Sequence, residues 1–188
     1  MNDEGLLERE AELQREAAAF VEDPRLSDVL GRAGRVVPLG SAVTGLMVWR
    51  DLDFGVDAPA LTSEVAWETM RPLIVRCSSL RYVQDDDHGR HYFVMHIDGW
   101  KIDVSLWPAG MPPEVEAFRA ELIARLADPL RIVLLHLKSA WCSSPVYPEV
   151  VSAWQIYDAV LNHGVRTLDE LDLYLDARGF PTSTGSPL

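Results

Sequence analysis

The fold of this chain is decided by residues 40–54, whose sequence is GSAVTGLMVWRDLDF. The residues just before them, Val36–Leu39, are apolar and rich in valine, which predicts a short buried strand. Gly40 and Ser41 follow where that strand must turn into a helix, and a glycine there lets another group approach the backbone closely. The serine hydroxyl and the free N–H groups at the start of the helix predict a site for phosphate oxygens.

Two aspartates, Asp51 and Asp53, lie near the end of the same stretch in an apolar frame. Successive side chains of a strand point to opposite faces, so these two carboxylates share one face. They repel each other unless a cation lies between them. Mg²⁺ is commonly held by one or two carboxylates together with substrate phosphates. A phosphate site beside a magnesium site indicates nucleotide chemistry.

This pattern resembles the signature of the DNA polymerase beta-like nucleotidyltransferase superfamily. It is most similar to the small bacterial branch, which includes the minimal nucleotidyltransferases and the enzymes that modify aminoglycosides and lincosamides. The signature is a Gly-Ser pair, a second glycine and an Asp-hydrophobic-Asp triplet, here Gly40-Ser41, Gly45 and Asp51-Leu52-Asp53. Two positions depart from the branch. Thr44 stands where arginine is frequent, and Arg50 stands where a small polar residue is frequent.

The resemblance implies a Mg²⁺-dependent enzyme that moves a nucleoside monophosphate from an NTP, with ATP expected, to a hydroxyl or amine. Asp51 and Asp53 would hold the magnesium ion. Gly40, Ser41 and Thr44 would bind the nucleotide.

A third acid is predicted downstream, within a three-stranded meander over residues 79–107. Asp98-Gly99 is a strong two-residue hairpin signal, and this turn pairs Val94 with Asp103. One face of the hairpin is then apolar and predicted to be core: Phe93, Met95, Ile97, Trp100, Ile102, Val104 and Leu106. The opposite face carries the polar residues: Tyr92, His96, Lys101, Asp103 and Ser105.

Asp103 has two interpretations. It is either part of a solvated outer face or a third carboxylate that faces Asp51 and Asp53. The resemblance favours the second, because the family places a third acid on a neighbouring strand, where it is a metal ligand or the catalytic base. The other residues predicted to bind substrate on this face are Tyr92, His96 and Lys101, and a charge on either of the last two would tune the pKa of Asp103.

The predicted fold class is α+β, with an N-terminal nucleotidyltransferase-type mixed sheet flanked by helices and a C-terminal helical bundle. A Pro/Gly cluster at residues 108–113 marks the boundary. The predicted parts are a catalytic domain over residues 1–110, a helical substrate-binding domain over residues 111–180 and a disordered tail over residues 181–188. Helices are expected at residues 4–21, 25–32, 63–77, 114–127, 130–140 and 148–162, with a last one opened by Thr167.

Two further candidates have alternatives of their own. Lys138, in an apolar helix, either extends to solvent or points into the cleft between domains and holds a β- or γ-phosphate. The Asp85–His88 run is a conceivable metal site, but a solvated turn is favoured because no strand or helix fixes its side chains.

The inner face of the helix at residues 63–77 is expected to consist of apolar side chains: Val65, Met70, Leu73, Ile74 and Cys77.

The net charge of the chain indicates which classes of partner it is expected to bind. The chain has 188 residues and a formal net charge of −12, which disfavours nucleic acid because such binding depends on Lys and Arg neutralising phosphates. The acidic balance either attracts a cationic substrate or serves only solubility. The expected acceptor is therefore a small molecule, antibiotic-like or a metabolite.

Other partners remain open. A partner protein is the second class of acceptor, as in antitoxin-like nucleotidyltransferases that modify a toxin, and RNA ends are the third. A non-catalytic module that binds nucleotide or a partner is an alternative of a different kind, and a homodimer is a further possibility. Cys77 and Cys142 have no disulfide framework and predict a reducing compartment. With no signal peptide and no apolar run of transmembrane length, a cytoplasmic location without membrane attachment is expected.

Overall fold

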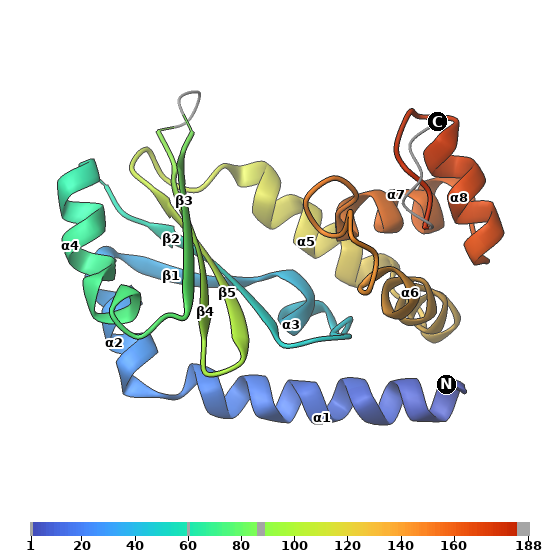
Figure 1. Cartoon of the computed structure of the whole chain (residues 1–188), viewed down its shortest axis with the longest axis horizontal. Coiled ribbons are helices and arrows are strands. Elements are labelled where there is room, and N and C mark those ends of the chain that lie inside the picture. The colour runs from blue at the N-terminus through green and yellow to red at the C-terminus, as the bar shows by residue number, and fades with distance from the viewer. Residues whose placement is uncertain (1, 60, 86–88, 184–188) are drawn as a thin grey trace. The chain divides into compact units, whose positions relative to one another are not determined.

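The computed structural model describes residues 2–59, 61–85 and 89–183 (Figure 1). Two compact units divide the chain. One is Glu12–Leu122, and the other combines Met1–Ala11 with Ile123–Leu188. Helix α1 (Asp3–Val21) contributes to both units.

The unit Glu12–Leu122 contains a five-stranded mixed sheet in the order β1-β2-β5-β4-β3 (Figure 1). The strands are β1 (Arg35–Leu39), β2 (Asp51–Asp57), β3 (Ser79–Gln84), β4 (His91–Ile97) and β5 (Trp100–Trp107). β2 and β5 run parallel, and every other neighbouring pair in this order is antiparallel. The helices of this unit, besides part of α1, are α2 (Pro24–Ala33), α3 (Gly40–Thr44), α4 (Ser63–Ile74) and most of α5 (Pro113–Arg125). This mixed sheet flanked by helices confirms the predicted α+β class.

The predicted hairpin register is confirmed. Asp98 and Gly99 both have positive φ, 51° and 81°, and Val94 is the Cα partner of Asp103. All the side chains predicted for the apolar face are buried, and they form one core with side chains from α1, α2 and α4. The opposite face of the sheet is therefore left for the polar residues.

The inner face of α4 differs from the prediction. Met70 and Leu73 are buried as expected, but Val65 is 49% exposed. The helix buries Ala66 instead, because Ala66, Met70 and Leu73 form one stripe at spacings of four and three residues. Val65 lies one position off this stripe and so faces away from the core.

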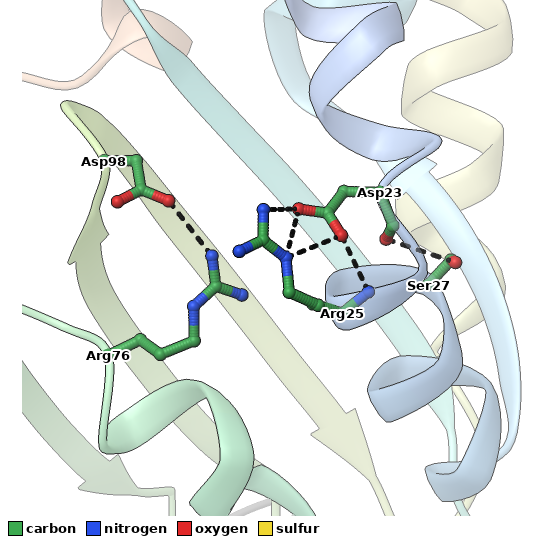
Figure 2. Close-up of polar contacts among 5 residues, drawn as sticks. All are labelled: Asp23, Arg25, Ser27, Arg76 and Asp98. Atoms are coloured by element: carbon green, nitrogen blue, oxygen red, sulfur yellow. Dashed lines mark hydrogen bonds and ion pairs between the residues drawn. The ribbon is translucent and has the colours of Figure 1, made fainter.

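Two ion pairs lie near each other, one at the N-cap of α2 and one at the tip of the β4–β5 hairpin. Figure 2 shows Asp23 accepting hydrogen bonds from the backbone and side chain of Arg25, and Arg76 donating to Asp98 at the hairpin tip. The Arg25 side chain and the backbone N–H of Arg25 lower the pKa of Asp23 to about 2. Asp23 is thus the charged N-cap of α2 at neutral pH.

The second unit contains three further helices, α6 (Asp128–Trp141), α7 (Ala153–His163) and α8 (Leu168–Asp176). Thr167 caps α8 as predicted. The helix predicted to begin at Pro148 begins instead at Ala153, because Ser152 and Gln155 form a capping box that fixes its first turn. Glu10 of α1, which is buried, pairs with Arg131 of α6 at 2.6 Å.

Two of the predicted segments, the polar loop and the C-terminal tail, are described only in part. Residues 86–88 of the predicted polar loop and residues 184–188 of the predicted tail lie outside the described residues. Within that tail, Ser183 donates two hydrogen bonds to Asp172.

Cys77 and Cys142 are free thiols, both half-buried. None of the helices in the described ranges combines the length and apolar character needed to cross a membrane.

Substitutions on α4 test which face is buried. Met70→Ala is expected to lower the free energy of unfolding by about 2–5 kcal/mol, because it leaves a cavity in the core. Val65→Ala on the same helix is expected to change it by about 0.5 kcal/mol or less, because Val65 is exposed. Urea denaturation followed by circular dichroism measures both values, and equal losses would contradict the assigned face.

A buried histidine makes stability depend on pH. His91 lies in β4 with Nδ1 2.8 Å from the Tyr82 hydroxyl, and burial lowers the pKa of His91 below its ordinary value of 6.5. Below that pH the unfolded chain binds the proton more readily than the folded chain. The contribution to stability is therefore complete above pH 6.5 and is lost as the pH falls through the folded-state pKa.

We therefore expect the free energy of unfolding to fall more steeply between about pH 7 and about pH 5 for the wild type than for His91→Gln. Glutamine keeps a polar group beside Tyr82 but does not titrate. The same slope in both proteins, measured by urea denaturation, would be inconsistent with a depressed histidine pKa.

Candidate active site

The three predicted acids lie together on the polar face of the sheet. Because β2 and β5 are adjacent and parallel, Asp53 is the Cα partner of Asp103, and Asp51 is the partner of Lys101. Leu52, between the two aspartates of β2, points into the core and is buried. The alternation of the strands thus separates the core from a cluster of three carboxylates, which we call the acid cluster (Asp51, Asp53 and Asp103).

Lys101 adds a cation to this cluster. Its Nζ donates to Asp51 Oδ1 at 3.1 Å and to Asp103 Oδ2 at 2.8 Å, and it lies 5.8 Å from the centre of the Trp49 ring. Burial alone would lower the pKa of Lys101, but the charges of Asp51 and Asp103 outweigh it and raise the pKa. The side chain is therefore an ammonium at neutral pH, and it bridges two of the three acids.

The two oxygens of Asp103 differ in their surroundings. Oδ2 accepts hydrogen bonds from the Tyr92 hydroxyl at 2.5 Å and from Lys101. Oδ1 is buried and accepts no hydrogen bond from any residue in the described ranges. Burial, together with the charge of Asp103, raises the pKa of Tyr92 above its ordinary value, so the phenol remains a donor. A buried carboxylate oxygen without a donor is costly unless a ligand completes it.

The cluster fits a hard divalent cation in its chemistry. Mg²⁺ prefers carboxylate oxygens, and Asp103 Oδ1 is a buried oxygen in need of a partner. Within the described part of the chain, no three His, Cys, Asp or Glu side chains are arranged as a ready-made metal site. The Lys101 ammonium is a positive charge that Asp51 and Asp103 both contact in this arrangement.

The predicted nucleotide-binding residues of α3 lie beside the cluster. Gly40 has a φ of +66°, and a Cβ there would lie 1.8 Å from Asp53 Oδ2. This glycine therefore lets the Asp53 carboxylate approach the backbone. Ser41 is buried at the start of α3, and the Thr44 hydroxyl donates back to the Gly40 carbonyl at 3.2 Å.

Other predicted residues have different surroundings. His96 is exposed, with Nδ1 2.7 Å from the Ser79 hydroxyl. Arg50, which departs from the resemblance, pairs with Glu16 of α1 at 2.7 Å. Lys138 belongs to the other unit, where it is buried and donates to the Tyr157 hydroxyl at 3.1 Å. The interpretation in which Lys138 extends to solvent is therefore wrong.

Sequence reasoning missed two residues that contact the neighbours of the cluster, Met111 and Arg90. Met111 covers Gly55 of β2, where a Cβ would lie 2.6 Å from the methionine sulfur. The Met111 N–H donates to Asp57 at 2.6 Å, and this hydrogen bond lowers the pKa of Asp57. The Arg90 guanidinium lies 5.0 Å from the centre of the Tyr92 ring. A glycine inside a strand signals a close neighbour, so Gly55 was the available clue for Met111.

A pair of glycine substitutions tests the contact between α3 and Asp53. Gly40→Ala is expected to lower the free energy of unfolding by at least about 1–2 kcal/mol, because the backbone is left-handed and the Cβ meets a carboxylate. Gly31→Ala in α2, where a Cβ meets no atom within 4 Å, is expected to stabilise the protein by about 0.5–1 kcal/mol. A Gly40→Ala protein as stable as the wild type in urea would contradict this packing.

In comparison with known proteins, this chain is similar to solved structures in fold but matches no known sequence family. The sequence matches no family model and no curated protein. Among solved structures, a cytoplasmic RNA terminal U-transferase superposes with a TM-score of 0.59 and 17% identity over 81% of this chain. The Cid1 poly(U) polymerase bound to magnesium and 3′-dATP gives a TM-score of 0.59 and 18% identity over 80% of this chain. The mtPAP structure in complex with CTP gives a TM-score of 0.53 and 16% identity over 99% of this chain.

The chain spans about half the length of these structures, covering 49%, 49% and 50% of them. All three are nucleotidyl-transferring or polymerase proteins by name, and their shared architecture agrees with the resemblance drawn from residues 40–54. The chain therefore shares its fold with the matched part of these solved structures.

Proposed function

We propose that this chain is a metal-dependent nucleotidyltransferase, which moves a nucleoside monophosphate from an NTP to a hydroxyl or amine of an acceptor. The observation that carries the proposal is the acid cluster itself. Asp53 and Asp103 are paired on adjacent parallel strands, Asp51 shares the face of Asp53, and Asp103 Oδ1 is buried without a hydrogen-bond donor among the described residues.

Each residue of the site would have its own role in the reaction. Asp51, Asp53 and Asp103 would hold Mg²⁺. When bound, the ion would neutralise the negative charge that develops on the α-phosphate and on the leaving pyrophosphate. Alternatively, Asp103 would accept the proton of the attacking group through Oδ1, which has no hydrogen-bond donor among the described residues. Tyr92 and Lys101 fix the orientation of Asp103 through its other oxygen.

The nucleotide would be bound by residues that the resemblance assigns. Gly40, Ser41 and Thr44 of α3 would receive its phosphates next to Asp53, and the contact of Gly40 with Asp53 supports this placement. Lys138 is kept as a phosphate-binding candidate on the resemblance alone. ATP is the nucleotide we would try first.

Two acceptors compete. The net charge of −12 favours a small cationic molecule, antibiotic-like or a metabolite, because extended RNA contacts depend on Lys and Arg. The similar solved structures favour an RNA end instead, since they include an RNA terminal U-transferase and a poly(U) polymerase. We propose the small molecule first and the RNA end second, with a partner protein or a non-catalytic binding role as the remaining alternatives.

Substitution of the acids tests the proposal. Asp51→Asn and Asp103→Asn are each expected to lower Mg²⁺-dependent pyrophosphate release at least about a hundredfold, because each removes one group that stabilises developing charge. The assay would supply each NTP in turn with pooled aminoglycosides, lincosamides or a short RNA.

Asp98→Asn is the matched control, since Asp98 is at the hairpin tip and pairs with Arg76 away from the cluster. It is expected to retain wild-type turnover. Absence of pyrophosphate release by the wild type with every NTP and acceptor, together with no Mg²⁺–NTP binding, would leave only the non-catalytic role.

A further inference from the structure

Arg119 of α5 contacts no acid in the described part of the chain. Its Nη1 donates to the Pro38 carbonyl at 3.3 Å, and among the described residues its guanidinium forms no ion pair. Other arginines of the same unit do pair with carboxylates, as Arg50 does with Glu16 at 2.7 Å. The contacts of Arg119 within these residues therefore leave its positive charge without a counter-charge.

The neighbouring turn of α5 contains an acid, but a different arginine holds it. Glu116 lies three residues before Arg119, a spacing at which helical side chains meet, yet its Oε1 accepts a hydrogen bond from Arg35 at 3.4 Å. Arg119 Nε is also buried and has no hydrogen-bond acceptor among residues 2–59, 61–85 and 89–183. A buried donor without an acceptor costs free energy unless a ligand supplies one. Arg119 Nε thus lacks an acceptor in the same way that Asp103 Oδ1 lacks a donor.

Arg119 is held next to the turn that the proposed function assigns to phosphates. Its hydrogen-bond partner Pro38 precedes Gly40 by two residues, and all three residues belong to the same compact unit. Residues 40–49 include no Lys, Arg or His. Thr44 is neutral, and its hydroxyl donates to the Gly40 carbonyl at 3.2 Å. The turn therefore has no basic side chain of its own to attract phosphate oxygens.

The chemistry of a guanidinium suits this place. Its N–H donors form a planar fork that matches the oxygens of a phosphate group, and its charge strengthens each hydrogen bond. We propose that Arg119 binds a β- or γ-phosphate oxygen of the nucleotide and so supplies the positive charge that the turn at Gly40 and Ser41 lacks. This inference rests on the proposed function, because it assumes that an NTP binds beside this turn.

Binding of inorganic tripolyphosphate and of ATP to the whole chain, each in the presence of Mg²⁺, tests the proposal by isothermal titration calorimetry. Tripolyphosphate has the phosphates of an NTP without its base and sugar, so it reports on phosphate contacts alone. Arg119→Gln is expected to bind both probes about tenfold or more weakly, because it loses a charge-assisted hydrogen bond. Arg119→Lys keeps the charge but not the fork, and its affinities are expected to lie between those of Arg119→Gln and the wild type.

Arg71→Gln is the control for net charge, since Arg71 is exposed on α4 and pairs with Glu68. It is expected to leave both affinities unchanged. Urea denaturation would confirm that each variant is folded, because a purely structural role for the contact of Arg119 with Pro38 would change stability and not phosphate affinity.

The possible results separate this inference from the proposed function. If Arg119→Gln binds both probes as tightly as the wild type, nucleotide binding stands and the role of Arg119 is overturned. A loss of affinity for ATP but not for tripolyphosphate would also overturn it, since Arg119 would then contact the base or the sugar. If the wild type binds neither probe, the proposed nucleotide site fails, and the role of Arg119 fails with it.

Discussion

The ammonium of Lys101 bridges Asp51 and Asp103, and this interaction offsets the repulsion between carboxylates that the sheet brings together. Parallel pairing of β2 with β5 brings Asp53 beside Asp103, where carboxylates would repel each other. The same register pairs Leu52 with Ile102 on the opposite face, in the core. Burying such a side chain contributes about 1.5–3 kcal/mol. Hydrophobic packing therefore sets the register that gathers the acids, and Lys101 offsets their repulsion.

Much of this arrangement could be predicted from the sequence because it depends on local signals. The Asp98-Gly99 turn specifies the pairing of Val94 with Asp103, and strand alternation then assigns every face of the hairpin. The β2–β5 pairing joins segments far apart in the chain, so only the resemblance placed Asp103 near Asp51. The hydrogen bonds of Lys101 could not be foreseen, because they require the three-dimensional positions of two strands.

Errors in the prediction came from competing local signals. Pro148 is a plausible helix start, but the Ser152–Gln155 capping box satisfies the first N–H groups of α7 and so determines where it begins. On α4, Val65 was assigned to the core although it lies one residue off the stripe of Ala66 and Met70. In both places the apolar residues of the sequence were a misleading guide. The capping box determines the start of α7, and the spacing of residues around the helix determines which face of α4 is buried.

The central claim is that the three carboxylates of this sheet face form a metal site for nucleotide chemistry. The most direct test is a crystal grown with Mn²⁺ and a non-hydrolysable ATP analogue, examined by anomalous scattering at the manganese edge. We expect an anomalous peak within coordination distance of Asp53 and Asp103, with the triphosphate beside Gly40 and Ser41. A well-ordered cluster without a manganese peak, in a crystal that binds the nucleotide elsewhere or not at all, would contradict it.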